Sequence, residues 1–200
     1  MNKDFKKNKY CVVKKVLSDE IINFMFDYLI QKRTVAKILF FKNYISPFEK
    51  IHGTFGDPQV KEAYSIYGDV AVDLMLLKLQ KIMEKNTGKK LYPTYSYSRV
   101  YQKGNELKKH VDRPSCEISA TLNWGGDLWP IFIKSNNKDI KIDLHPGDIL
   151  IYKGEELQHW REPFNKKLCV QSFLHYNDMN NHYRNNFNDN RPALGLPKDV

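Results

Sequence analysis

The 200-residue sequence predicts a single α+β domain in which helices come first and a β-rich core follows. Three observations support this fold class. Apolar residues recur at helical spacing within residues 1–90, apolar and polar residues alternate at strand spacing within residues 91–176, and turn signals separate the short strands of that second region. Closely spaced short strands are typical of a sandwich, barrel or jelly roll, so we expect the helices to pack on one face of its sheets.

Residues 1–90 form the predicted helical support region. A short strand is expected at residues 10–13, and Ser18 then has the properties of a helix N-cap because acidic residues follow it. Asp57-Pro58 predicts the start of a second helical region, with the aspartate as N-cap and the proline in the first turn. This region is expected to end at Asn86-Thr87-Gly88. Its apolar stripe consists of Val72, Met75, Leu76, Leu79 and Met83.

Residues 91–176 form the predicted β-rich core. Period-2 alternation is clearest in the segments 95–101 and 118–124. The other expected strands are 131–133, 140–144, 148–152 and 168–176. The turns between strands carry Gly125-Gly126, Ser135-Asn136-Asn137 and Pro146-Gly147. Residues 177–200 are rich in asparagine and predict a C-terminal tail with little regular structure rather than a second domain.

The distribution of apolar residues and cysteines indicates the expected cellular compartment of the protein. No stretch of about 18 apolar residues occurs, so the sequence predicts no membrane-spanning helix. The basic residues 1–9 are not followed by the apolar segment of a secretory signal. Cys11, Cys116 and Cys169 are widely spaced and include no C-x-x-C, which argues against a disulfide framework. A reducing cytoplasm is therefore the expected compartment.

The net charge of +9 bears on possible partners. An excess of positive charge can attract nucleic acid, acidic proteins or anionic small molecules. The lysines are scattered or lie in short runs and no arginine-rich stripe occurs, so a solvated lysine-rich surface is the favoured interpretation. Nucleic acid is only a weakly supported partner, and the sequence gives no prediction of the oligomeric state.

His110-Val111-Asp112 is the strongest local signal of a metal site. If these residues lie in a strand, the imidazole and the carboxylate point to the same side. A third ligand would complete a set of two histidines and one carboxylate, which holds Fe(II) and leaves other coordination positions open. His159 is the expected third ligand because it follows the turn Pro146-Gly147-Asp148 and a buried strand. His145 competes for this role, but it lies in that turn, directly before the proline.

Residues 97–176 resemble the double-stranded β-helix core of the 2-oxoglutarate/Fe(II) oxygenases, particularly the prolyl 4-hydroxylase-like group. The matching segments are Arg99–Gly104 (R-x-Y-x-x-G), His110–Asp112 (H-x-D), Pro146–Asp148 (P-G-D) and the distal His159. The resemblance implies a jelly-roll or cupin-like core with the N-terminal helices packed on one sheet. It also implies that His110, Asp112 and His159 are the iron ligands and the catalytic residues.

The resemblance further implies how 2-oxoglutarate is held. Tyr101, nine residues before the first iron ligand, matches a tyrosine that hydrogen-bonds this cosubstrate. The remote carboxylate usually pairs with a basic residue some way after the distal histidine, at a position where this sequence has Cys169. If the intervening loop is shortened, Lys167 falls on the anchor position, and a lysine suits a single carboxylate. Lys166 and Arg161 are competitors for the same role.

The implied activity is that of an Fe(II)- and 2-oxoglutarate-dependent dioxygenase, which consumes O2, hydroxylates a C–H group and releases succinate and CO2, with ascorbate as a supporting reductant. A protein or peptide side chain, of the prolyl type, is the expected substrate, and Arg113 is a candidate substrate contact. One alternative is an oxygenase of the same fold that acts on nucleic acid or a small molecule. Another is a cupin-like β-domain that binds a metal without catalysis.

Overall fold

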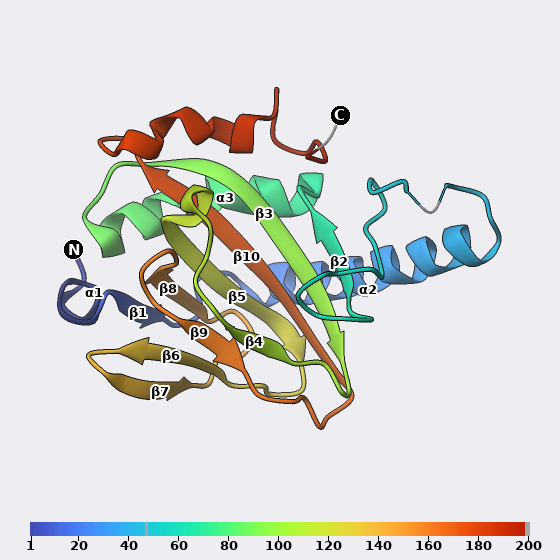
Figure 1. The fold of residues 1–200 in the computed structure, drawn as a ribbon, viewed down its shortest axis with the longest axis horizontal. Helices are drawn as coiled ribbons and strands as arrows, with labels where there is room; N and C mark the ends of the chain where they lie inside the picture. The colour runs from blue at the N-terminus through green and yellow to red at the C-terminus, as the bar shows by residue number, and fades with distance from the viewer. Residues whose placement is uncertain (47, 199–200) are drawn as a thin grey trace.

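Two antiparallel β-sheets form the centre of the protein in the computed structural model, which describes residues 1–46 and 48–198 (Figure 1). The larger sheet contains, in spatial order, β1 (Tyr10–Val13), β8 (Ile149–Lys153), β5 (Ile118–Gly126), β10 (Leu168–Asp178), β3 (Leu91–Gln102) and β2 (Tyr64–Tyr67). The smaller sheet contains β4 (Leu107–His110), β9 (His159–Arg161), β6 (Ile131–Ser135) and β7 (Lys138–Ile142). From β3 onward the chain alternates between the sheets except at the β6–β7 hairpin, which is the winding of a double-stranded β-helix. The predicted fold class is confirmed.

The strand register brings two predicted metal ligands together. In the larger sheet, the long strand β10 pairs with β3 on one edge and β5 on the other, and it is buried along almost its whole length. In the smaller sheet, His110 of β4 lies opposite His159 of β9. Strands β4 and β9 have only four and three residues, so sequence alternation could not reveal them.

Helices α2 (Asp19–Phe41) and α3 (Val70–Thr87) cover the outer face of the larger sheet and lie behind it in Figure 1. Ser18 caps α2 as predicted, because its hydroxyl accepts a hydrogen bond from the Ile21 amide. The buried apolar residues of the two helices are Ile22, Met25, Leu29, Ala36, Val72, Leu76, Leu79 and Met83. They pack in one cluster with residues of β5, β8 and β10. Within the described ranges, no helix is both long and apolar enough to cross a membrane.

The prediction that Asp57-Pro58 starts a helix is wrong. Helix α3 begins at Val70, and Asp69 caps it by accepting hydrogen bonds from the amides of its first turn. Asp57 instead accepts the amides of Gln59 and Val60 in a tight turn. Its carboxylate also pairs with the Arg99 guanidinium, 2.6 Å away, so a tertiary contact fixes this turn beside the cavity described below.

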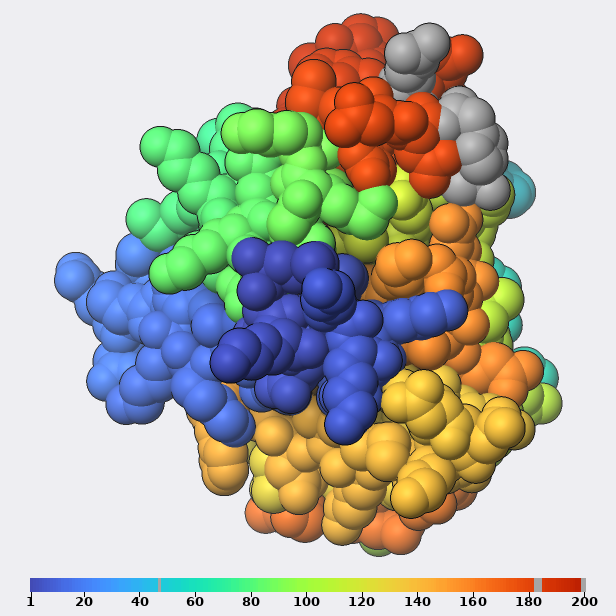
Figure 2. Space-filling model, turned by 90° about the vertical axis from the view of Figure 1, so that its left-hand side faces the viewer, coloured from blue at the N-terminus to red at the C-terminus, as the bar shows by residue number. Residues whose placement is uncertain are grey.

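The C-terminal segment, which we define as residues 182–198, packs against the body of the protein, and the sequence pattern alone did not predict this packing. This segment begins with 3₁₀ geometry at His182, departs from helical geometry at Asn186–Asp189, and lies against β3, β10 and the short 3₁₀ turn Pro114–Cys116. Figure 2 shows it (red) on top of the region formed by α3 and β3 (green). Two buried charged residues, Asp189 and Arg191, hold it there, and such side chains are rarely buried without partners.

The N-terminal segment closes the side of the molecule shown in Figure 2. Helix α1 (Lys3–Asn8) and β1 (dark blue) lie between the α3 region and the β6–β7 hairpin (gold). The Asn2 amide donates to the Asn86 carbonyl at 2.8 Å, and the Ser135 hydroxyl donates to the Asn8 carbonyl at 2.8 Å. These contacts tie the first residues to both the helical layer and the smaller sheet.

Candidate metal and cosubstrate site

Three side chains with metal-binding atoms meet where β4 and β9 pair. The Nε2 atoms of His110 and His159 lie 3.7 and 3.5 Å from Oδ1 of Asp112. The two imidazole rings are 4.3 Å apart between centroids. The structure therefore brings together the three residues that the sequence predicts as metal ligands.

Backbone carbonyls orient both imidazole rings. Nδ1 of His110 donates to the Lys108 carbonyl at 2.8 Å, and Nδ1 of His159 donates to the Leu157 carbonyl at 2.9 Å. Because a carbonyl can only accept, each neutral ring carries its proton on Nδ1 and leaves Nε2 as a free lone pair. Partners of this kind orient the histidine ligands of metal sites. Burial and the neighbouring His159 lower the pKa of His110, which favours the neutral, metal-binding form.

Asp112 divides its two carboxylate oxygens between two tasks. Oδ1 faces the imidazoles, whereas Oδ2 accepts a hydrogen bond of 2.7 Å from the Ser119 hydroxyl. The same hydroxyl oxygen lies 3.0 Å from Nδ1 of His175. Burial alone would raise the pKa of Asp112, but the interactions with His159, His175 and Ser119 outweigh it and lower that pKa. The carboxylate is therefore held in its ionised form.

Asp112 lies outside the strand, contrary to the expectation that the whole H-x-D motif is extended. Strand β4 ends at His110, and the Asp112 amide donates to the Gly154 carbonyl at 2.9 Å. A Cβ atom on Gly154 would overlap Oδ2 of Asp112, the Ser119 hydroxyl and the Cys116 carbonyl. Glycine is thus required by close packing at the metal ligand. The sequence gives no signal of this role, because Gly154 lies far from Asp112 along the chain.

A second set of potential ligands, Asp112, Cys116 and His175, is also closely spaced. Its other contacts make it the poorer metal site. Nδ1 of His175 is engaged by Ser119, and the Cys116 sulfur lies 3.0 Å from the Tyr95 hydroxyl. Burial raises the pKa of Cys116 well above its usual value, and a protonated thiol is a poor metal ligand. His145, the other competing histidine, is exposed in its turn and does not line the cavity.

A cavity of about 440 Å³ opens beside the two imidazoles. Its walls combine aromatic side chains with ion-paired ones. The aromatic residues are Tyr67, Tyr95, Tyr97, Tyr152 and Phe173. Arg99, on one wall, is paired with Asp57, and Arg113, which follows Asp112, is paired with Asp189 of the C-terminal segment. His110, Asp112 and His159 all line this cavity, so a bound metal would face it.

Arg161 and Tyr101 are buried and do not themselves line the cavity. Tyr101 packs against Leu107 and Phe173, which form what we call the inner wall of the cavity, and Arg161 lies beside Tyr101. Arg161 is 1% exposed, and its guanidinium donates only to neutral groups, the Trp129 carbonyl and the Gln171 side chain. No carboxylate of the described residues forms an ion pair with it, and its Nε atom has no partner. The Tyr101 hydroxyl also makes no hydrogen bond of normal geometry within the described part of the chain. Burial lowers the pKa of Arg161 and raises that of Tyr101.

Lys167, the predicted cosubstrate anchor, does not reach this region. Lys166 and Lys167 are both exposed, and neither lines the cavity. The Lys167 amide donates to the Asp127 carboxylate at 2.9 Å, which fixes the chain outside the sheets just before β10 begins. Cys169, two residues later, is the one that turns inward and packs in a buried cluster with Tyr101. Of the basic residues considered from the sequence, only Arg161 is close to Tyr101.

Comparison with known proteins identifies the fold. No family model matches the sequence, and no curated protein is similar to it in sequence. A prolyl-4-hydroxylase from Pseudomonas putida is similar over 86% of this chain and 95% of its own, with a TM-score of 0.61 and 12% identity. HygX from Streptomyces hygroscopicus, solved with nickel and 2-oxoglutarate, matches over 88% and 85%, with a TM-score of 0.65 and 10% identity. EctD from S. alaskensis matches over 96% and 84%, with a TM-score of 0.64 and 15% identity.

These likenesses confirm the double-stranded β-helix and the predicted resemblance to 2-oxoglutarate/Fe(II) oxygenases at the level of the fold. One EctD structure contains iron. Since a fold can carry many functions, the residues of this chain must support any activity assigned to it.

Proposed function

We propose that this protein is an Fe(II)- and 2-oxoglutarate-dependent dioxygenase that hydroxylates a C–H group and releases succinate and CO2. One observation carries the proposal: a set of two imidazoles and one carboxylate lines a cavity, and a buried arginine without a carboxylate partner lies behind the inner wall. The ligand set suits Fe(II), and the arginine suits an organic anion. A metal site with a purely structural role would have no need of a buried uncompensated cation.

His110, Asp112 and His159 would hold the metal. The donor set fits, because both Nε2 atoms carry a lone pair, with the Tyr152 hydroxyl at a long 3.4 Å from that of His159, and Oδ1 of Asp112 is turned toward them. Bound iron supplies the activation of O2 that allows a C–H bond to be oxidised at the expense of 2-oxoglutarate. The protein keeps the three donors together by two backbone carbonyls and the Ser119 hydroxyl, and it presents them to the cavity.

Arg161, in place of Lys167, would bind the remote carboxylate of 2-oxoglutarate. Within the described residues the buried Arg161 Nε and Tyr101 hydroxyl make no hydrogen bond of normal geometry, and a carboxylate placed between them would satisfy both groups. Arg161 follows His159 by two residues in β9, so both side chains point to the same face of the smaller sheet. Leu107 and Phe173 line the cavity and also pack with Tyr101, and they would contact the methylene carbons of the cosubstrate.

We infer that the substrate is a side chain of a protein or peptide. The main cavity and a second one of about 500 Å³ share Pro58, Gln59, Leu107 and His110, so a groove continues past the metal ligands beside β4. Strand β4 is an edge strand of the smaller sheet, and an extended peptide can pair with such an edge.

A small-molecule substrate is the second candidate, because HygX, with a similar fold, has been solved with hygromycin B bound. Nucleic acid has less support. The sequence has no arginine-rich stripe that could follow a nucleic-acid backbone, and Arg99 on the cavity wall is neutralised by Asp57.

The proposal is tested by adding Fe(II) and then 2-oxoglutarate to the protein without oxygen, recording the absorption of the complex, and then admitting air. We expect a new absorption band on addition of 2-oxoglutarate and slow formation of succinate. The Asp112→Ala variant should show neither. If protein that is shown to contain iron neither binds 2-oxoglutarate nor forms succinate, the oxygenase proposal fails and the non-catalytic metal-binding domain takes its place.

The substrate class is tested separately with a library of synthetic peptides. Mass spectrometry would detect the addition of one oxygen atom to a peptide. If 2-oxoglutarate is bound but no peptide is oxidised under conditions where a small-molecule panel is, the peptide assignment is wrong and the oxygenase assignment stands.

A further inference from the structure

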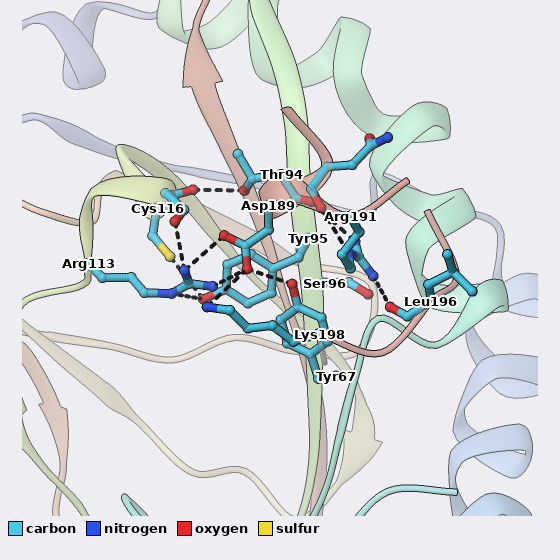
Figure 3. A network of polar contacts seen from close by, with 12 residues as sticks. Tyr67, Thr94, Tyr95, Ser96, Arg113, Cys116, Asp189, Arg191, Leu196 and Lys198 are labelled. Carbon is cyan, nitrogen blue, oxygen red and sulfur yellow. Dashed lines mark hydrogen bonds and ion pairs between the residues drawn. The ribbon is translucent and has the colours of Figure 1, made fainter. Parts of the chain in front are cut away.

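The C-terminal segment forms part of the mouth of the main cavity. Lys198 lines this cavity together with Arg113 and the stacked rings of Tyr67 and Tyr95, whose centroids are 4.8 Å apart. Figure 3 shows Arg113 and Lys198 converging on the Asp189 carboxylate from two directions. Residues that are far apart in sequence therefore build one charged group at the entrance.

Asp189 is the central contact of this group. Its Oδ1 accepts a hydrogen bond of 2.8 Å from Nη1 of Arg113, and its Oδ2 accepts bonds of 2.5 Å from Nη2 of Arg113 and 2.6 Å from the Tyr67 hydroxyl. The Lys198 ammonium lies 3.6 Å from the same Oδ2. The Asp189 side chain is 2% exposed, whereas those of Arg113 and Lys198 are 38% and 49% exposed. The carboxylate is thus inside, and both cations face the opening.

The backbone is held in an unusual conformation to place Asp189 there. Asn188, Asp189 and Asn190 are all left-handed, with φ angles of 50°, 57° and 64°. Asparagine and aspartate tolerate this region best among residues with a Cβ atom, but three in succession need support from the surroundings. Arg191 supplies it: its guanidinium pairs with Asp73 at 3.0 Å and donates to the Thr94 carbonyl at 3.2 Å. The mouth is a built structure rather than a chance contact.

A charge inventory of the cavity leaves one cation without a partner of its own. Arg99 is compensated by Asp57, and Arg113 is compensated by the bidentate pair with Asp189. Under the proposed function, Arg161 is compensated by the remote carboxylate of 2-oxoglutarate. The metal is compensated by Asp112 and the chelating carboxylate of the cosubstrate. Lys198 shares Asp189 with the closer Arg113, so its ammonium group remains as the surplus positive charge at the entrance.

We propose that Lys198 and Arg113 bind an anionic group of the substrate, a carboxylate or a phosphate, beside the group that is hydroxylated. This inference rests on the proposed function, because it assigns the substrate class of the same site. Asp189 is a positioning residue that aims the Arg113 guanidinium, which also lies over the Tyr95 ring with Cζ 4.4 Å from its centroid. A peptide substrate would therefore carry an acidic or phosphorylated side chain close to its reacting residue.

The donor count supports this assignment. Nε of Arg113 faces the Tyr95 hydroxyl at 3.4 Å, and Nη1 donates to Ser115 and Asp189. Nη2 donates one of its two protons to Asp189, so a second proton remains available. The Lys198 ammonium has three protons, and among the described residues its ion-pair contact is the distant Asp189 carboxylate. An oxyanion at the mouth could accept from both groups at once, which is a charge-assisted arrangement.

The enzymatic test uses paired peptide libraries. One library contains aspartate, glutamate or phosphoserine at varied distances from each candidate residue, and its partner contains asparagine, glutamine or serine at the same places. We expect wild-type protein to turn over the acidic or phosphorylated members with about tenfold higher kcat/KM, mostly through KM, because a charged hydrogen bond is gained. In Lys198→Met this preference should fall to within about twofold, while Lys81→Met, which removes an exposed lysine remote from the cavity, should retain it.

Equal turnover of both libraries by the wild type, or a full preference in Lys198→Met, would overturn the inference. The carboxylate and phosphoserine members separate the two possible sources of the anion. A preference for only one of them identifies which anion the mouth accepts.

A second measurement does not depend on iron or turnover. The Nε–Hε signal of Arg113, assigned with the Arg113→Lys variant, is followed by NMR during titration of the metal-free protein with acetate or inorganic phosphate. We expect a saturable shift that weakens about tenfold in Lys198→Met. No saturable shift, or the same shift in Lys198→Met, would refute the anion site. A Lys198-dependent shift, together with no succinate formation by the iron-loaded protein, would instead support the anion site and reject the oxygenase proposal.

Discussion

The two ends of the cavity each contain an arginine, but the two residues differ in compensation. At the inner end, Arg161 is fully buried, lies over the Trp129 ring, and donates hydrogen bonds to a backbone carbonyl and a side-chain amide of the described residues. At the mouth, Arg113 is partly exposed and has a bidentate carboxylate partner, Asp189. Removing a guanidinium from water is costly, and the cost falls when an anion is bound. The protein therefore supplies the anion at the mouth and leaves it to a ligand at the inner end.

This difference distinguishes structural charge from functional charge. An ion pair with a buried carboxylate, such as Arg113–Asp189 or the fully buried Arg191–Asp73, fixes a segment in place. A buried cation without an anion is stable only if the rest of the protein supports it until a ligand arrives, and such sites are candidates for function. From this contrast we expect the inner end to bind the cosubstrate. We expect the mouth, which ion pairs hold in place, to bind the substrate.

The largest effect is expected where the two ends meet, at the metal ligand Asp112. Gly154→Ala places a Cβ atom on top of Oδ2 of Asp112 and the Ser119 hydroxyl. The carboxylate must then shift, so metal affinity should fall by more than the roughly 100-fold that loss of an outer partner of a metal ligand costs. Calorimetric titration with Co(II) or Fe(II) measures this change. Gly56→Ala is the matched control, because its Cβ would meet only the Thr54 hydroxyl at 3.5 Å, and wild-type affinity in Gly154→Ala would contradict the prediction.

The second-largest expected effect is on 2-oxoglutarate binding at the inner end of the cavity. In Arg161→Gln the carboxylate of 2-oxoglutarate loses its cation, and we expect the concentration for half-maximal 2-oxoglutarate binding to rise about 100-fold. Metal affinity should change little, because Arg161 contacts none of the three ligands. Lys167→Gln, which alters an exposed side chain outside the cavity, should leave 2-oxoglutarate binding within about twofold of wild type. A larger effect of Lys167→Gln than of Arg161→Gln would restore the anchor predicted from the sequence.

The contrast between Arg161 and Lys167 shows what sequence reasoning could and could not find. Alternation, turn signals and the H-x-D motif predicted the strand core, the helical layer and the grouping of His110, Asp112 and His159. Distance along the chain suggested Lys167, but which side of β10 a residue faces depends on the loop before it. The Asp127 carboxylate fixes that loop through two backbone amides, and no local pattern reveals such a contact.

The error at Asp57 and the unpredicted packing of the tail have the same cause. An aspartate before a proline caps many helices, but here the Arg99 guanidinium and a tight turn use the Asp57 carboxylate. The asparagine-rich segment lacks an apolar pattern, yet Asp189 and Arg191 attach it through ion pairs with residues far along the chain. Contacts with residues far along the chain determine the conformation at these positions, so sequence periodicity cannot predict it. The role of Gly154 is equally hidden from sequence patterns, because it depends on the lack of a Cβ atom where this residue packs against the metal ligand Asp112.

A smaller effect concerns pH and the buried histidine on the mouth side. Burial lowers the pKa of His175 to about 4 from an unfolded value of about 6.5. The unfolded chain therefore binds more protons between these values, so the stabilising contribution is complete above about pH 6.5 and is lost as pH falls toward 4. The free energy of unfolding should fall by about 2 kcal/mol between pH 7 and 5 from this group alone.

Denaturant unfolding at the two pH values measures the loss attributed to His175. His175→Gln should remove that part of the pH dependence, while His145→Gln, at an exposed turn, should keep it. An unchanged difference between pH 7 and 5 in His175→Gln would contradict the assignment.

The smallest effect tests whether the mouth supports the metal as well as the substrate. A continuous path of contacts runs from Oδ2 of Asp112 to Ser119 at 2.7 Å and from there to His175 at 3.0 Å. It continues through the Tyr95 ring, whose centroid is 4.5 Å from that of His175, to the Arg113 guanidinium of the mouth.

Ser119→Ala removes the donor to Oδ2, so Asp112 gains rotational freedom and metal affinity should fall roughly tenfold. Ser98→Ala is the matched control, because Ser98 is equally buried but bonds to Ser172, away from the metal. Titration with Co(II) or Fe(II) compares the two variants, and equal affinities would mean that Oδ2 needs no support. If Ser119→Ala weakens metal binding whereas Arg161→Gln weakens only 2-oxoglutarate binding, the two ends perform separate tasks. The mouth then supports the metal ligand, and the inner end holds the cosubstrate.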